Sequence, residues 1–154
     1  MPIAVGQRAP AVDHEAHDGS RIVIGDGGDQ TITVLYFYPA DETKGCTAQA
    51  CSFRDDYEAF EDAGARVVGV SGDSLDKHRS FAENHRLPFP LISDRSGALR
   101  KAYDVRRTLG LIPGRVTFVI DAKGVVRHVF DSQLRATQHV REAVEVVKSL
   151  VREG

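Results

Sequence analysis

A chain of 154 residues is long enough for one domain with a core of ordinary size and short for two, so we expect a single domain over residues 1–154. The hydrophobic fraction of 42%, the charged fraction of 27% and the formal net charge of -2 are typical of a soluble globular protein and give no reason to expect nucleic acid or a membrane surface as a partner. The N-terminus lacks the pattern of a targeting signal, and no stretch reaches the roughly eighteen apolar residues of a membrane span, so we expect a cytoplasmic protein.

The first half of the chain is predicted to form a hairpin, a buried strand and a helix. Two short apolar stretches between residues 11 and 24 flank an Asp-Gly pair at 18–19 that favours a tight turn, which predicts an N-terminal β-hairpin. Residues 31–39 form a nearly continuous β-branched and aromatic run that ends in proline, as in a central strand buried on both faces. Apolar residues then recur at steps of three and four among charged ones, which predicts one amphipathic helix from about Cys46 to a stop at Gly64.

The second half repeats the alternation of strands and helices. The expected elements are a buried strand at 66–71, a helix from a cap at Asp73 or Ser74 to about His85, a short strand at 91–93, a short helix at 96–103, a strand pair at 115–121 and 124–130, and a helix at 137–151. On the last helix, Val140, Val144, Val147 and Val151 form one apolar stripe. This order predicts an α/β sandwich with a mixed central sheet flanked by helices.

Both cysteines of the chain, Cys46 and Cys51, follow the predicted central strand directly. Cys46 falls where that strand passes into a helix, which is the edge at which open α/β sheets present their reactive groups. In the first turn of a helix, unpaired backbone N–H groups and the positive end of the helix dipole favour the thiolate over the thiol. Cys46 is therefore the candidate nucleophile.

The helix terminus alone does not stabilise a thiolate enough for neutral pH. Ionising an ordinary thiol there takes roughly 3.4 kcal/mol of preferential stabilisation, whereas a helix terminus supplies roughly 0.3 to 2 kcal/mol. A hydroxyl from Thr43 and an arginine guanidinium are suitable further donors. Sequence spacing leaves the arginine open among five candidates, which are Arg54, Arg100, Arg106, Arg107 and Arg115.

Cys51 follows Cys46 by five positions, which is not the spacing of a Cys-x-x-Cys redox pair. In an intact helix this separation places the two Cα atoms about 8.7 Å apart, whereas a disulfide needs roughly 7 Å or less. If both cysteines lie on one helix, they cannot bond until its first turn unwinds, and Gly45 would make that rearrangement easier. Taken alone, Cys51 fits better as a small buried helix residue.

A zinc site is a weaker alternative for the two cysteines, because it would need two further ligands. The histidines at 14, 17, 78, 85, 128 and 139 show no paired metal-ligand spacing with them. His14 and His17 fall in the predicted hairpin and are expected on its solvated surface. The glycine-rich run at 25–29 precedes a strand and carries two aspartates, so it predicts a turn and not a phosphate-binding loop.

The residues around Cys46 resemble those of a known family. The pattern Pro39-x-x-x-Thr43-x-x-Cys46 matches the active-site pattern of the peroxiredoxins, and GCTAQACSFRD resembles their bacterioferritin-comigratory-protein and Q-type subfamily. The similarity extends along nearly the whole chain, for example through the stretches at 68–74 and 114–126. It implies a thioredoxin fold with an N-terminal β-hairpin extension, and thiol-dependent reduction of hydrogen peroxide and organic hydroperoxides without a metal or organic cofactor.

The resemblance also implies a role for each matching residue. Cys46 would be the peroxidatic cysteine, which attacks the O–O bond and becomes a sulfenic acid. Thr43 would hold the sulfur and the peroxide, Arg115 would stabilise the thiolate and the leaving oxygen, and Pro39 would shield the sulfur from water. Cys51 would be the resolving cysteine, whose disulfide with Cys46 is reduced by thioredoxin or a similar thiol donor.

Two other interpretations of the same residues stay open. One is a thioredoxin-fold redox sensor or thiol-holding chaperone that uses Cys46 for signalling, and the other is a catalytically silent scaffold with two core cysteines. A silent scaffold has no reason to combine Pro39, Thr43, Cys46 and Arg115, whereas a sensor could keep all four. Lys44 stands where many relatives have proline, and no change of mechanism is expected from it. A monomer is expected, with a homodimer as the alternative.

Overall fold

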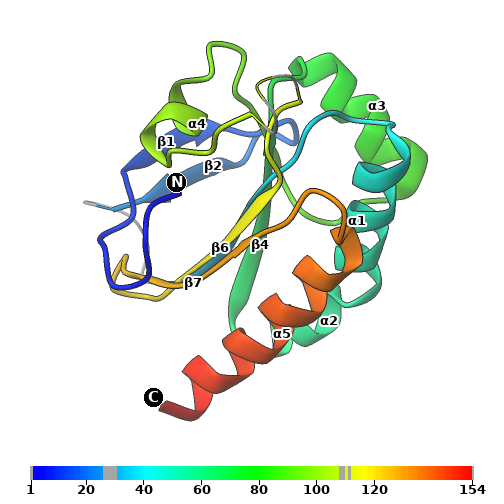
Figure 1. Ribbon diagram of the computed structural model, residues 1–154. Coiled ribbons are helices and arrows are strands. Elements are labelled where there is room, and N and C mark those ends of the chain that lie inside the picture. The colour runs from blue at the N-terminus through cyan, green and yellow to red at the C-terminus, as the bar shows by residue number, and fades with distance from the viewer. Residues whose placement is uncertain (1, 26–30, 108–109, 111, 154) are drawn as a thin grey trace.

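The computed structural model describes residues 2–25, 31–107, 110 and 112–153 and has a layered α/β fold (Figure 1). The strands are β1 (Val12–Glu15), β2 (Arg21–Ile24), β3 (Ile32–Phe37), β4 (Ala65–Ser71), β5 (Leu91–Ser93), β6 (Val116–Ile120) and β7 (Val126–Asp131). The helices are α1 (Lys44–Asp55), α2 (Tyr57–Asp62), α3 (Leu75–His85), α4 (Ala98–Ala102) and α5 (Ala136–Glu153). None of the described helices is both long and apolar enough to cross a membrane.

The larger sheet has five strands in the order β5-β4-β3-β6-β7, with β3 at its centre. β3 runs parallel to β4 and antiparallel to β6, which makes the sheet mixed. β1 and β2 form a separate antiparallel hairpin. The predicted central strand, mixed sheet and N-terminal hairpin are therefore confirmed.

The side chains of β3 and of Tyr38, which follows it, alternate between two hydrophobic clusters, one on each face of the sheet. Val34, Tyr36 and Tyr38 lie in a cluster shared with α1, α2, α3 and α5, whereas Leu35 and Phe37 lie in a cluster shared with the hairpin and α4. Figure 1 shows those four helices on one side of the sheet and the hairpin with α4 on the other. Burial on both faces explains why this run is apolar throughout.

The register of the sheet explains why distant parts of the chain meet at one end of β3. Phe37, the last residue of β3, pairs with Val116, the first residue of β6. Tyr38 and Arg115 are the next residues outward along these antiparallel strands. The β3–α1 loop (residues 38–43) leaves the sheet at this point. Arg115 therefore lies beside that loop although the two are far apart in the sequence.

The helix predicted from Cys46 to Gly64 is instead two helices, α1 and α2, separated at Asp56. The backbone of Asp56 has φ -97° and ψ 7°, outside helical geometry. Its N–H still bonds to the Ser52 carbonyl at 3.1 Å, and its own carbonyl accepts from Ala59 N at 3.0 Å in a tighter turn. Phe53 and Phe60 stay in the same hydrophobic cluster across the break, so the apolar spacing does not reveal it.

Smaller differences concern element ends and one histidine. The short helix expected from residue 96 is α4, which begins only after Gly97, whose φ of 77° is left-handed. On α5, Val151 is 47% exposed, so the apolar stripe stops before this residue. The expectation of a solvated His17 is wrong, because its Nδ1 accepts from Leu91 N at 3.0 Å and burial lowers its pKa. The turn predicted for the glycine-rich run falls mostly on residues 26–29, which lie outside the described residues.

A substitution of Gly69, on β4, tests how closely Leu91 and Tyr36 pack against this strand. A Cβ atom at this position would lie 2.8 Å from Leu91 Cδ2 and 3.0 Å from the Tyr36 ring, so we expect Gly69→Ala to lower the free energy of unfolding by about 1–3 kcal/mol. Urea unfolding measures the effect. Gly72→Ala is the control, because its Cβ would meet only the Asp94 carbonyl oxygen at 3.8 Å. Equal stability of the two variants would contradict the close packing of Tyr36.

Candidate active site

Cys46 is the third residue of α1, and its side chain is 1% exposed. The residue before the helix, Thr43, has extended backbone geometry, with φ -82° and ψ 153°. The sulfur therefore lies at the N-terminal turn, where backbone N–H groups favour negative charge. Cys51 is on the same helix and half-buried, and both cysteines are free thiols. The predicted junction of strand, loop and helix thus holds both sulfurs.

Arg115, directly before β6, contacts the sulfur. Its Nη2 donates to Cys46 Sγ at 3.3 Å, and the side chain is buried. Its Nη1 donates to Gln49 Oε1, and its Nε donates to the Gln133 carbonyl at 3.2 Å. Three partners hold the planar guanidinium in one orientation, so a fixed positive charge and an N–H donor face the thiol.

Gly45 makes this approach possible. A Cβ atom on Gly45 would lie 3.1 Å from Arg115 Nη2, which is tighter than about nine in ten real Cβ contacts, so the guanidinium would have to shift. Its absence opens the space that the guanidinium occupies beside Cys46. The glycine before the cysteine was interpreted from the sequence only as a source of backbone freedom, and its role in close approach depends on where Arg115 lies.

Gln49 is a site residue that the sequence reasoning missed. Its side chain is fully buried, and its Oε1 accepts from Arg115. A neutral amide orients the guanidinium without cancelling its charge, as a carboxylate would. Its Nε2 has no hydrogen-bond partner among the described residues. The available signal was a polar residue three positions after Cys46, on the buried face of an amphipathic helix.

Arg100, another candidate, braces the site without touching the sulfur. It donates to the carbonyl oxygens of Tyr38 at 2.7 Å and Gly114 at 3.0 Å, and burial lowers its pKa. These carbonyls adjoin the β3–α1 loop and Arg115, so Arg100 joins the two segments. Arg54 and Arg106 have other partners, the His85 carbonyl and Asp104 respectively.

Thr43 and Pro39 both lie in the β3–α1 loop. The Thr43 hydroxyl is exposed and donates to the Ala40 carbonyl at 2.8 Å, so a bond to the sulfur or to a peroxide would require it to turn away from this carbonyl. Pro39 is half-buried directly after Tyr38. Their predicted roles at the sulfur therefore remain predictions.

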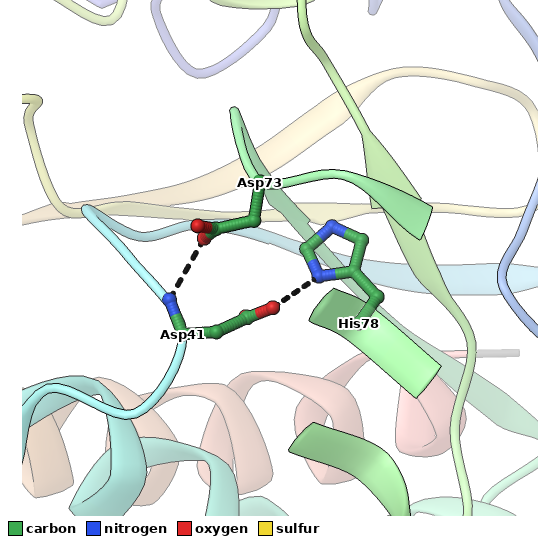
Figure 2. Close-up of side chains that lie close together, drawn as sticks. All are labelled: Asp41, Asp73 and His78. Atoms are coloured by element: carbon green, nitrogen blue, oxygen red, sulfur yellow. Dashed lines mark hydrogen bonds and ion pairs between the residues drawn. The ribbon is translucent and has the colours of Figure 1, made fainter. Parts of the chain in front are cut away.

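A polar cluster next to the same loop was also missed. Asp41, Asp73 and His78 are a group of described residues whose ligand atoms lie within 4.8 Å of one another (Figure 2). Asp41 Oδ2 lies 2.6 Å from His78 Nδ1, and Asp41 N donates to Asp73 Oδ2 at 2.8 Å. Because hydrogen bonds already occupy these atoms, we assign no metal to the cluster.

The fold and the site together define a class, a thioredoxin-like α/β protein with a buried cysteine where the central strand passes into a helix. The description of the matching family model is AhpC/TSA family, and it covers residues 5–129. The chain belongs to this family, and within it to the peroxiredoxin Q group.

The comparisons that support this assignment cover most of the chain. The chloroplastic peroxiredoxin Q of Populus jackii is 44% identical over 146 residues, which are 94% of this chain and 68% of that one. The chloroplastic peroxiredoxin Q of Triticum aestivum is 49% identical over 118 residues, 76% of this chain and 54% of that one. The crystal structure of peroxidoxin BcpB from Mycobacterium tuberculosis has a TM-score of 0.83 at 32% identity and covers 95% of this chain and 97% of that one. The chain thus spans only part of the plant relatives, and the expected family and fold are confirmed.

Proposed function

We propose that the protein is a thiol-dependent peroxidase that reduces hydrogen peroxide and organic hydroperoxides to water and alcohols. The observation that carries the proposal is the buried contact between Arg115 Nη2 and Cys46 Sγ, 3.3 Å long, in the first turn of α1. A fixed cation and a helix N-terminus both stabilise a thiolate, which is the reactive form of cysteine. A catalytically silent scaffold would not need a buried guanidinium beside the sulfur, so this contact favours an active thiol.

The reaction begins at Cys46. Its thiolate donates an electron pair to the nearer peroxide oxygen, and the S–O bond forms as the O–O bond breaks. The departing oxygen leaves with the electrons of that bond and takes a proton to become water or an alcohol. Arg115 and the first-turn N–H groups stabilise the negative charge that develops there. In this scheme Thr43 turns its hydroxyl toward the peroxide, and Pro39 limits the access of water to the sulfur.

Cys51 completes the cycle. Its thiol condenses with the sulfenic acid on Cys46, water is released, and an intramolecular disulfide forms. Both residues lie on the intact α1, so the first turn must unwind before the sulfurs can meet. Thioredoxin or a similar dithiol then reduces the disulfide. No metal or organic cofactor takes part in these steps.

The cellular setting and the assembly of the protein are part of the same proposal. We propose a cytoplasmic location, because two cysteines are too few for a disulfide scaffold, whereas the plant relatives are named chloroplastic. We also propose a monomer, with a homodimer as the alternative. We propose a single domain, because both hydrophobic clusters are built on the same sheet. Sedimentation of the reduced and oxidised protein tests the monomer.

One equivalent of hydrogen peroxide added to the reduced protein tests the chemistry. We expect the intact mass to fall by about two hydrogens as the disulfide closes, because water carries the oxygen away. Cys46→Ser should not react, and Cys51→Ser should stop at the sulfenic acid or its overoxidised products. Equal loss of peroxide reactivity in both variants before any turnover would contradict the assigned roles. Turnover of many equivalents with thioredoxin present separates an enzyme from a sensor.

A further inference from the structure

The β3–α1 loop is tied to the neighbouring layer by a buried acidic side chain that the peroxide chemistry does not use. Asp41 Oδ2 lies 2.6 Å from His78 Nδ1 on α3, and Asp41 Oδ1 accepts from the Tyr38 hydroxyl at 2.5 Å. The backbone N–H of Asp41 donates to Asp73 Oδ2 at 2.8 Å, as Figure 2 shows. One residue of the loop is thus bonded through its side chain and its backbone.

The His78 ring closes the connection to the sheet. Its Nε2 lies 3.0 Å from the Ile92 carbonyl on β5, which can only accept, so Nε2 carries a hydrogen. Its Nδ1 faces the Asp41 carboxyl group, and a hydrogen bond of 2.6 Å joins it to Asp41 Oδ2. The side chains of His78 and Asp41 are 0% and 2% exposed. A charge-assisted hydrogen bond away from water is strong, and removing one partner leaves the other buried without compensation.

The anchored loop is continuous with the first turn of α1. The Thr43 hydroxyl donates to the Ala40 carbonyl at 2.8 Å, and the Thr43 carbonyl accepts from Thr47 N at 2.8 Å. Asp41 lies between Ala40 and Thr43, so it fixes the segment that holds the turn of Cys46. Releasing Asp41 would loosen that turn together with the loop.

We propose that the Asp41–His78 pair holds the β3–α1 loop in the conformation that receives peroxide, and so sets how often the first turn of α1 opens for the disulfide to close. Both are positioning residues, because neither touches the sulfur. The proposal rests on the proposed thiol peroxidase function. The proposal predicts opposite effects on two steps of the cycle, because a looser loop slows the reaction of Cys46 with peroxide and speeds disulfide closure. Simple structural damage does not give this combination.

Asp41→Asn is the main test, since asparagine keeps the shape and loses the charge. In stopped-flow experiments with hydrogen peroxide, we expect the second-order rate constant of Cys46 oxidation to fall roughly tenfold and the first-order rate constant of disulfide closure to rise roughly tenfold. Overoxidation of Cys46 at high peroxide, followed by intact mass, should fall accordingly. His78→Gln should shift both rate constants in the same directions.

Glu42→Gln is the matched control on the same loop. Glu42 also bonds to α3, through His85 Nε2 at 2.7 Å and Asn84 Nδ2 at 2.8 Å, but its side chain is 47% exposed. Exposed pairs contribute little, so we expect both rate constants to stay within about twofold of wild type. An Asp41→Asn variant that behaves like this control, or that slows both steps, would overturn the proposal.

A measurement on the reduced protein keeps this inference separate from the peroxidase proposal. Amide hydrogen exchange of residues 44–47 should be faster in Asp41→Asn than in wild type and in Glu42→Gln, whatever the protein does to peroxide. Unchanged exchange in a folded Asp41→Asn protein would overturn the anchor. If wild type itself forms no disulfide with peroxide, the peroxidase proposal fails, and the exchange result still decides the anchor.

Discussion

Arg115→Ala is expected to lower the second-order rate constant for the reaction of Cys46 with hydrogen peroxide by about 10²–10³-fold. The guanidinium is buried, and its Nη2 is 3.3 Å from the sulfur, so it acts where water does not screen its charge. Its loss removes one stabilising donor from the thiolate and from the departing oxygen. Stopped-flow measurement of the reduced protein gives the rate constant directly.

Three further variants make this result specific. Arg115→Lys keeps a charge but loses the planar fork that also binds Gln49, so it should recover only part of the rate. Gln49→Ala leaves the guanidinium in place with less restraint and should cost about tenfold. Arg106→Ala, at an exposed arginine bonded to Asp104, should react like wild type. A fully reactive, folded Arg115→Ala would remove the arginine from the mechanism and leave the role of Cys46 untouched.

The elements of the fold were predictable where the side-chain pattern is itself the cause of the structure. β3 is apolar in sequence because both of its faces are buried, and β5 (Leu91–Ser93) was predicted with its observed bounds. The break at Asp56 was not predictable in this way. It changes the backbone at one residue, while Phe53 and Phe60 remain in the same cluster, so the periodicity continues across it.

The same limit applies to the site, because its residues come from parts of the chain that are far apart in the sequence. The position of Cys46 in the first turn of a helix followed from local pattern alone. The choice of Arg115 among five arginines depends on the pairing of Phe37 with Val116 between β3 and β6, which no local spacing encodes. The resemblance to the peroxiredoxins pointed to Arg115, and the strand register gives the physical reason why it can reach the sulfur.

Two buried histidines went unnoticed in the sequence because their partners are distant along the chain. No role was predicted for His78 or His139, but His78 bonds to Asp41, 37 positions away, and His139 bonds to Thr117, 22 positions away. The two buried rings differ in their partners. His78 has an acceptor at each nitrogen, whereas His139 has a hydroxyl at Nδ1 and a carbonyl at Nε2. The His78 ring is hydrogen-bonded to a carboxyl group, whereas the His139 ring is neutral because burial lowers its pKa to about 4.

His139 is expected to make the protein sensitive to acid. The ring is fully buried on α5, and its Nε2 donates to the Ser132 carbonyl at 2.7 Å, while Nδ1 accepts from the Thr117 hydroxyl at 2.7 Å. Burial lowers the pKa of His139 to about 4. An unfolded histidine ionises at a pKa of about 6.5, so between these values the unfolded chain binds a proton that the folded protein does not. Stability from this residue is complete above about pH 6.5 and is lost as the pH falls toward 4, by about 3 kcal/mol in total.

Urea unfolding of wild type and His139→Gln at pH 7.5 and pH 4.5 measures this contribution. We expect the loss of stability on acidification to be smaller in His139→Gln by about 2–3 kcal/mol, even if the variant is less stable at pH 7.5. His128→Gln is the control, because that partly exposed histidine on β7 bonds to Glu142 at the surface and should leave the acid loss as in wild type. The same loss in all three proteins would show that carboxyl groups, and not His139, cause the acid sensitivity. Because Ser132 N also donates to the Arg115 carbonyl at 3.2 Å, protonating His139 in the folded protein would loosen the segment that positions the guanidinium, so this effect on peroxide reactivity is expected only near pH 4, where the folded ring itself ionises.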